Sequence, residues 1–237
     1  MITRLPPCVA CIGSAVSFEA CTGRGEACGL LHCHGRLIAK DAYVFHQKDA
    51  ATHVHWVRRG LLRLYKTLAN GKRQIVGFAF PGEFVDLAAE HQYRISAQAV
   101  VETELRSMPR ARFKSAAQAD AQFAYHLFVS VAKRLAHTSD LTLTVGQRSA
   151  EASLAAFLIE MHERTAMGDP DTCDLFLPMP RSDIADYLGL TPETISRLFT
   201  RFTQQGLIAT CKRRGVSLLS LGALQRLAQG LPNGSGN

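Results

Sequence analysis

Three polar side chains between Thr191 and Arg197 have the types and spacing needed to recognise the edges of base pairs. Glu193 and Arg197 are four residues apart, so a helix would place them on one face, with Ser196 close to them. Arginine can donate two hydrogen bonds to guanine O6 and N7, and glutamate can accept one from cytosine N4. These residues therefore predict readout of a G·C pair, with about 1–3 kcal/mol of discrimination for each good contact.

A second set of polar residues suits contacts to phosphates or support of the reading helix. Its predicted members are Arg181, Ser182, Thr191, Thr194, Arg201, Lys212 and Arg213. From Thr191 to the end, Glu193 is the single acidic residue beside six lysines and arginines, and the whole chain carries a formal charge of +7. This balance favours an anionic partner, double-stranded nucleic acid first. A surface Glu–Arg pair is otherwise usually only a solvated ion pair, so the prediction depends on the surrounding elements.

The elements predicted around these residues form a winged helix-turn-helix. The segment Ser182–Leu188 has the apolar spacing of a short helix, and Gly189 forms the turn after it. A second helix follows, with Thr191 as its N-cap and proline at its first position, and it stops at Gly206. Two β-type runs then flank the basic tip 212–215 as a hairpin, the wing. Such a fold projects the N-terminal side chains of its second helix into the major groove.

The rest of the chain predicts an α+β protein. Short β-type runs with glycine turns, including a hairpin at Asn70-Gly71, indicate a β-roll of the jelly-roll type. Apolar residues at every fourth position, Phe123 to Leu135, then predict a long helix suited to dimerisation. The expected organisation is a Cys-rich arm at 1–35, a β-roll at 36–115, a dimerisation helix at 116–146, a winged helix-turn-helix at 147–230 and a disordered tail at 231–237.

The segment Arg181–Arg197 resembles the helix-turn-helix of the CRP/FNR superfamily. Its Glu193-x-x-Ser196-Arg197 form resembles the FNR/FixK branch in particular. The resemblance implies a homodimer on a palindrome close to TTGAT, four base pairs, ATCAA, in which Glu193 and Arg197 read the G·C pair and Ser196 helps to select the neighbouring thymine. It also implies an activator that recruits RNA polymerase in oxygen-limited or nitrogen-oxide metabolism, with a β-roll related to cyclic-nucleotide-binding domains.

The same resemblance argues against cyclic AMP as the ligand of the β-roll. Cyclic-AMP-binding members have a Gly-Glu pair after the Gly-Glu-Phe turn, and an Arg-Ser/Thr-Ala triplet on a later strand. Here those positions hold Asp86-Leu87 and Ile95-Ser96-Ala97. An aspartate repels a phosphate, and the neighbouring Arg94 would point to the opposite face of a strand. We therefore expect no cyclic AMP binding.

The effector is open between an iron–sulfur cluster and no small ligand at all, with haem on one of the histidines as a minor further option. Cys8, Cys11, Cys21 and Cys28 are candidate thiolate ligands for an iron–sulfur cluster, as in FNR-like oxygen sensors. However, no cysteine lies between Cys33 and Cys173, whereas FNR itself takes its fourth ligand from the β-roll. FixK-like action without any small-molecule cofactor is therefore our preferred interpretation. Cys173 and Cys211 are candidate oxidation-sensitive thiols.

The chain shows no sign of an enzyme or of a secreted or membrane protein. It lacks a phosphate-binding loop, an HExxH motif and a nucleophile–base grouping. A metal or thiol-redox enzyme built on the Cys-rich arm is the alternative from another functional class. No apolar stretch reaches the about 18 residues of a membrane span, and the N-terminus lacks signal-peptide organisation. We expect a cytoplasmic protein without disulfides.

Overall fold

A computed structural model describes residues 34–87, 91–125, 127–132, 135, 149–165, 175–211 and 215–230. The chain divides into two compact units, residues 1–136 and 137–237. Among the described residues, no helix is both long and apolar enough to cross a membrane. The Cys-rich arm predicted at 1–35 and the tail predicted at 231–237 lie outside the described residues, except that a strand begins at His34.

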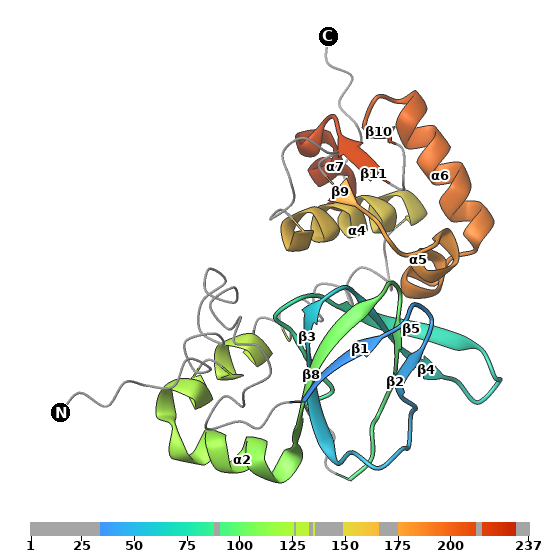
Figure 1. Ribbon diagram of the computed structural model, residues 1–237. Coiled ribbons are helices and arrows are strands. Elements are labelled where there is room, and N and C mark those ends of the chain that lie inside the picture. The colour runs from blue at the N-terminus through green and yellow to red at the C-terminus, as the bar shows by residue number, and fades with distance from the viewer. Residues whose placement is uncertain are drawn as a thin grey trace. The chain divides into compact units, whose positions relative to one another are not determined.

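The first unit is an antiparallel β-roll followed by helices (Figure 1). Its strands are β1 (His34–Ile38), β2 (Tyr43–Phe45), β3 (His53–Arg59), β4 (Leu62–Thr67), β5 (Arg73–Ala79), β6 (Phe84–Val85), β7 (Ser96–Ala99) and β8 (Thr103–Pro109). They form two four-stranded sheets, in the orders β1-β8-β3-β6 and β2-β7-β4-β5. Small and branched apolar side chains of both sheets, such as Leu62, Val85 and Ala97, fill the core between them. This confirms the predicted jelly-roll class.

One turn of the roll depends on a glycine. Gly60 joins β3 to β4 with a φ of +97°, a conformation that residues with a Cβ rarely adopt. A Cβ at this position would lie 2.5 Å from Thr103 Oγ1 and 2.6 Å from the carbonyl oxygen of Glu102. The Thr103 hydroxyl occupies the space beside Gly60. It is held there because it donates to the Leu61 carbonyl and accepts from the Leu61 N–H, both at 3.2 Å. Gly60 therefore permits the close approach of the β3–β4 turn to the start of β8.

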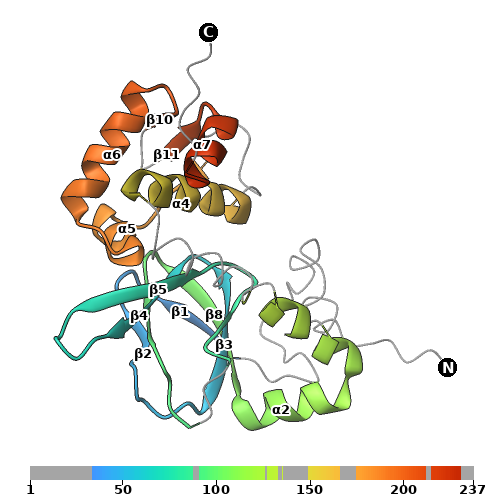
Figure 2. The ribbon, with the colours of Figure 1, turned by 180° about the vertical axis from the view of Figure 1, so that it is seen from behind.

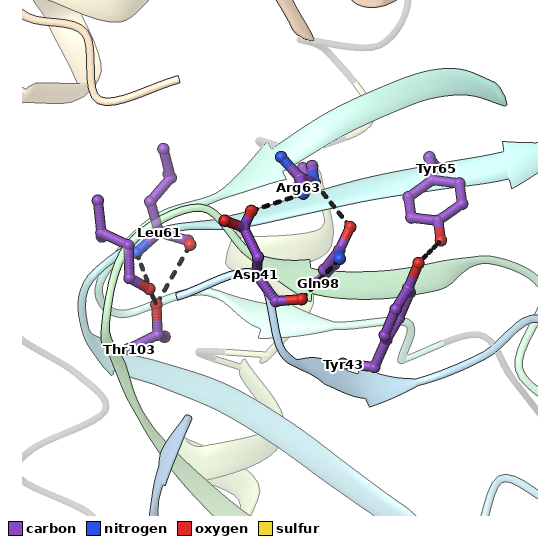
Figure 3. A network of polar contacts seen from close by, with 8 residues as sticks. Asp41, Tyr43, Leu61, Arg63, Tyr65, Gln98 and Thr103 are labelled. Atoms are coloured by element: carbon purple, nitrogen blue, oxygen red, sulfur yellow. Dashed lines mark hydrogen bonds and ion pairs between the residues drawn. The ribbon is translucent and has the colours of Figure 1, made fainter. Parts of the chain in front are cut away.

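A polar network around the buried Arg63 holds the turn between β1 and β2 onto the second sheet (Figure 3). The guanidinium of Arg63 donates to Gln98 Oε1 and to Asp41 Oδ1, both at 2.9 Å. Gln98 in turn donates to the backbone carbonyl of Asp41 at 2.7 Å. Beside them, the hydroxyl of Tyr65 donates to that of Tyr43, and burial is the main cause that raises the pKa of Tyr65 to about 12. A buried arginine is tolerated here because a carboxylate and an amide satisfy it.

Two helical segments follow the roll, and they do not have the predicted boundaries. β8 runs directly into α2 (Arg110–Ala119), which packs beside β3 and β8 (Figure 2). α2 ends at Asp120, whose carboxylate accepts from the backbone N–H groups of Gln122 and Phe123 and so begins a new helix. Residues 121–125 and 127–132 are helical. The continuous helix expected from residue 116 is therefore two helices, because the Asp120 side chain caps a fresh N-terminus.

The apolar stripe of this second helix is buried at its first residue and exposed at its last ones. Phe123 is 2% exposed and packs edge-on against Phe113, and Leu127 is half-buried. Val131 and Leu135 are 49% and 66% exposed. A helix turns about 100° per residue, so a spacing of four advances each side chain by about 40° around the axis. The stripe that the sequence presents as one face therefore packs on α2 at its start and faces outwards at its end.

A half-buried histidine, His55, links three parts of the roll. His55 Nδ1 lies 2.7 Å from Ser107 Oγ, and its Nε2 lies 3.0 Å from the hydroxyl of Tyr93, which donates to the His53 carbonyl. Both ring nitrogens of the neutral imidazole are thus satisfied. Burial, followed by the positive charges of His53, Arg36 and Arg110, lowers the pKa of His55 from 6.5 to about 4. The uncharged ring is the form that the fold stabilises.

Acid should therefore destabilise the β-roll between pH 6.5 and pH 4. In this window the unfolded chain binds a proton at His55 and the folded chain does not, so the free energy of unfolding falls as the pH falls, by roughly 3 kcal/mol in total. Trp56 is the single tryptophan and is buried on β3, so its fluorescence during urea titrations reports this domain. His55→Gln should flatten the decline, and His91→Gln at an exposed site should not. An unchanged slope in His55→Gln would contradict the assignment.

The second unit contains four helices and a small sheet among its described residues. Its elements are α4 (Ala150–Thr165), β9 (Leu175–Phe176), α5 (Arg181–Leu188), α6 (Pro192–Gln204), β10 (Ile208–Thr210), β11 (Gly215–Leu218) and α7 (Leu221–Ala228). The three strands form an antiparallel sheet in the order β10-β11-β9. The helix-turn-helix and the wing hairpin lie within one residue of their predicted bounds, and β9 was not predicted.

Candidate nucleic-acid interface

The local sequence fixes the start of α6. Thr191 Oγ1 accepts a hydrogen bond from the N–H of Thr194 at 3.1 Å, which caps the helix, and Pro192 occupies the first helical position. Before it, Gly189 ends α5 with a φ of +69°, the left-handed conformation expected of a helix C-terminus. Thr191 and Thr194 thus support the helix, as the sequence predicts. The buried side of α6 consists of Ile195, Leu198, Phe199 and Phe202.

Glu193 and Arg197 lie on the opposite, outer side of α6. Both side chains are 81% exposed, and the Arg197 guanidinium lies 3.7 Å from the Glu193 carboxylate. Such an exposed ion pair contributes roughly 0–1 kcal/mol to stability. Each side chain can therefore leave its partner and contact a base edge at little cost. Ser196 is also exposed, and its hydroxyl donates to the Pro192 carbonyl, which leaves the oxygen able to accept. All three base-reading candidates therefore face away from the core.

The outer side of α6 forms a shallow groove that extends beyond these residues. The side chains lining it are Ser196, Arg197, Thr200, Arg201 and Gln204. Thr200 and Gln204 were not among the predicted site residues. Their positions at seven and eleven residues after Glu193 repeat the helical period, so the same spacing argument would have found them. The available face for recognition is about three turns long.

α5 packs against the buried side of α6. The guanidinium carbon of Arg181 lies 3.2 Å from the centroid of the buried Phe199 ring, a cation–π contact between the two helices. A second link joins α5 to α4, where the Tyr187 hydroxyl donates to the buried carboxylate of Glu160 at 3.1 Å. Ser182 at the start of α5 is exposed. The contacts of Arg181 and Ser182 to phosphates stay predictions, and Arg181 in addition packs against α6 through Phe199.

Arg201 makes a contact that the sequence did not predict. Its guanidinium donates to a carboxylate oxygen of Glu151, in the first turn of α4, fifty residues earlier in the chain. No local pattern could have shown this pair, because it depends on how α4 packs against α6.

The wing is present, and its basic tip lies outside the described residues. β10 pairs with β11 from Ile208–Leu218 to Thr210–Val216, and the Cys211 N–H donates to the Gly215 carbonyl at 2.9 Å. Lys212 and Arg213 were predicted to contact phosphates, and they fall in the undescribed tip. The sulfur of Cys211 is in a disulfide, whereas we expected a protein without disulfides, and the sensitivity of Cys211 to oxidation stays a prediction. Cys173 also lies outside the described residues.

Comparison with known proteins agrees with this geometry. Residues 152–227 match the Crp-like helix-turn-helix domain, and residues 36–120 match the cyclic nucleotide-binding domain. The nitrogen fixation regulation protein FixK of Bradyrhizobium diazoefficiens is 38% identical over 187 residues, which cover 78% of each chain. The chain belongs to the CRP/FNR family of transcription regulators. The transcriptional activatory protein AadR of Rhodopseudomonas palustris, at 37% identity over 74% of this chain and 73% of its own, is a further relative.

The structure of FixK2 from Bradyrhizobium japonicum places the chain in the FixK branch of the CRP/FNR family. It superposes with a TM-score of 0.75 at 33% identity and covers 82% of this chain and 96% of its own. The helix-turn-helix of a CRP/FNR regulator binds DNA, so the candidate face on α6 belongs to a DNA-binding domain. The relatives are transcription regulators rather than enzymes, which confirms that prediction. Because residues 36–120 match a cyclic nucleotide-binding domain, a cyclic phosphate is the ligand to consider for the β-roll.

The β-roll of this CRP/FNR protein does not fit a cyclic nucleotide. Asp86 has a φ of +48°, and its carboxylate accepts from the Arg94 N–H at 2.8 Å, where the resemblance expects a phosphate-binding turn. Arg110 donates to the carbonyls of Asp86 and Leu87, which fixes this segment from within. The Ser96 hydroxyl accepts from the backbone N–H of Gln47 at 2.9 Å. Among the described groups at the expected phosphate site, the Asp86 carboxylate would repel a cyclic phosphate. Arg110 and Ser96 already make hydrogen bonds within the protein.

The candidate metal ligands cannot be placed. Cys8, Cys11, Cys21 and Cys28 lie outside the described residues, and so does Cys33. Within the described part of the chain, no three His, Cys, Asp or Glu side chains gather in a way that would hold a metal ion. The iron–sulfur alternative therefore stays a prediction from the N-terminal arm.

Proposed function

We propose that this CRP/FNR regulator is a FixK-like activator, which binds a TTGAT-N4-ATCAA palindrome as a homodimer in the cytoplasm. The observation that carries the proposal is the outward presentation of Glu193 and Arg197, four residues apart near the N-terminus of a capped helix. A recognition helix reads bases with side chains at this end. Arg197 would read guanine, Glu193 would read cytosine, and the Ser196 oxygen would lie near the adjacent thymine.

The exposed apolar side chains of the helical residues 121–125, 127–132 and 135 support the homodimer. Four large apolar side chains lie there in solvent, namely Tyr125, Phe128, Val131 and Leu135. Large apolar patches on a helix usually mark an interface, and a two-fold dimer pairs a surface with its own copy. Two copies would thereby present two reading helices, about one DNA turn, ~34 Å, apart.

The misfit of the β-roll supports action without a cyclic nucleotide. Asp86 and Arg110 engage the described part of the turn where a cyclic phosphate would be expected. Activation through RNA polymerase, in oxygen-limited or nitrogen-oxide metabolism, comes from the resemblance to the FNR/FixK branch. The names of the relatives, a nitrogen fixation regulation protein and a transcriptional activatory protein, agree with this role.

The test is DNA binding by protein purified in air and assayed as iron-free. Without any added nucleotide, it should prefer the palindrome over a scrambled duplex of equal length by about a thousandfold or more in fluorescence anisotropy. Lengthening the four-base-pair spacer by five should abolish the preference, since it moves one half-site to the opposite side of the duplex. A requirement for iron or for cyclic AMP would contradict the cofactor-free proposal, and equal affinity for both duplexes would contradict sequence-specific recognition.

A further inference from the structure

The face of α6 carries two Glu–Arg pairs of different kinds. Glu193 and Arg197 belong to one helix, and their groups are 3.7 Å apart and almost fully solvated. Glu151 and Arg201 join two helices by a direct hydrogen bond, and their side chains are 30% and 57% exposed. Partial burial reduces the screening of the second pair by salt. Arg201 is therefore held by its carboxylate more firmly than Arg197.

Arg201 lines the shallow groove on α6. A phosphate backbone would pass near it if α6 entered the major groove of DNA. Arg201 advances about 40° around α6 from Arg197, away from Ser196 and towards α4. A helix in the major groove has a sugar–phosphate backbone along each flank. A guanidinium in this place suits a phosphate rather than a base edge. In the unbound protein it is neutralised by Glu151, so the flank offers one positive charge fewer than the sequence suggests.

Glu151 carries its negative charge near the N-terminus of a helix. It lies in the first turn of α4, where the N-terminal end of the helix dipole favours a negative charge. For Arg201 to give its full charge to a phosphate, its guanidinium must leave this carboxylate. Breaking the ion pair opposes binding, whatever the base sequence.

We infer that Glu151 is a positioning residue that restrains Arg201 and weakens binding to DNA of every sequence. It acts through Arg201 and contacts no base. The inference rests on the proposed use of α6 for DNA binding, and it adds a determinant of affinity to the determinants of specificity at Glu193 and Arg197. Its signature is an equal effect on specific and random DNA, with a change in salt dependence.

The test compares Glu151→Gln, Arg201→Ala and the double variant on the palindrome and on a scrambled duplex, across a series of salt concentrations. Glu151→Gln should tighten binding to both duplexes about threefold for each reading helix, or about tenfold for a dimer. The slope of log K against log salt should steepen by about 0.9 per freed phosphate contact. In the Arg201→Ala background the substitution should have almost no effect.

A matched control is Glu163→Gln, the same charge change at an exposed site further along α4. Glu151→Gln overturns the inference if it weakens binding, leaves the salt slope unchanged, acts equally without Arg201, or matches Glu163→Gln. Thermal melts by circular dichroism confirm that each variant is folded. A wild-type protein without preference for the palindrome would refute the proposed function, while the effect of Glu151 would still be measured on the scrambled duplex.

Discussion

Arg197→Ala should lower the affinity for the palindrome by about 1–3 kcal/mol for each reading helix, and by about twice that for a dimer. The expected loss is large because Arg197 can give guanine two hydrogen bonds and gives up little in return. Its pair with Glu193 spans 3.7 Å between fully solvated groups. Anisotropy titrations on the palindrome, and on duplexes with its G·C pairs replaced by A·T, measure the effect.

The duplex with A·T in place of G·C tests whether Arg197 contacts the guanine base or only the phosphates. On the A·T duplex the variant should lose little compared with the wild-type protein, because the partner of the guanidinium has already been removed. Arg226→Ala, a change of equal charge at an exposed site on α7, should leave the base preference unaltered. Equal losses for Arg197→Ala on palindromic and scrambled DNA would mean that this arginine contacts only phosphates.

Phe128→Glu should separate the dimer into monomers and thereby abolish tight binding to the palindrome. Phe128 is 68% exposed on the same side of its helix as Val131, and a two-fold interface would bury it twice. Losing two buried phenylalanines costs roughly 3–6 kcal/mol, and the variant would also place two carboxylates near the symmetry axis. The dimer should therefore weaken at least about a hundredfold. Sedimentation velocity over a concentration series measures the change in oligomeric state.

A control on the same helix separates loss of the interface from damage to the fold. Gln122 is exposed and lies about a third of a turn around the helix from Phe128. Gln122→Glu adds the same charge there and should remain dimeric. The fluorescence of Trp56 should keep its native spectrum in both variants. A Phe128→Glu protein that remains dimeric at micromolar concentration would place the interface elsewhere.

The sequence by itself determined the features that depend on neighbouring residues. The turn at Gly189, the cap by Thr191 and the alternating strands of the wing all follow from contacts within a few positions, so their patterns survive in the linear chain. The outward position of Glu193 and Arg197 follows in the same way, since the apolar residues of α6 fix which side is buried.

The tertiary structure decided the features that join distant parts of the chain. The pairing of Arg201 with Glu151 spans fifty residues, and the hydrogen bonds of His55 reach Tyr93 and Ser107 in other parts of the roll. The apolar stripe beginning at Phe123 was readable, yet which part of it is buried depended on where the β-roll ends and the helix leaves it. Such contacts are set by packing between elements, and residue spacing along one element carries no information about them.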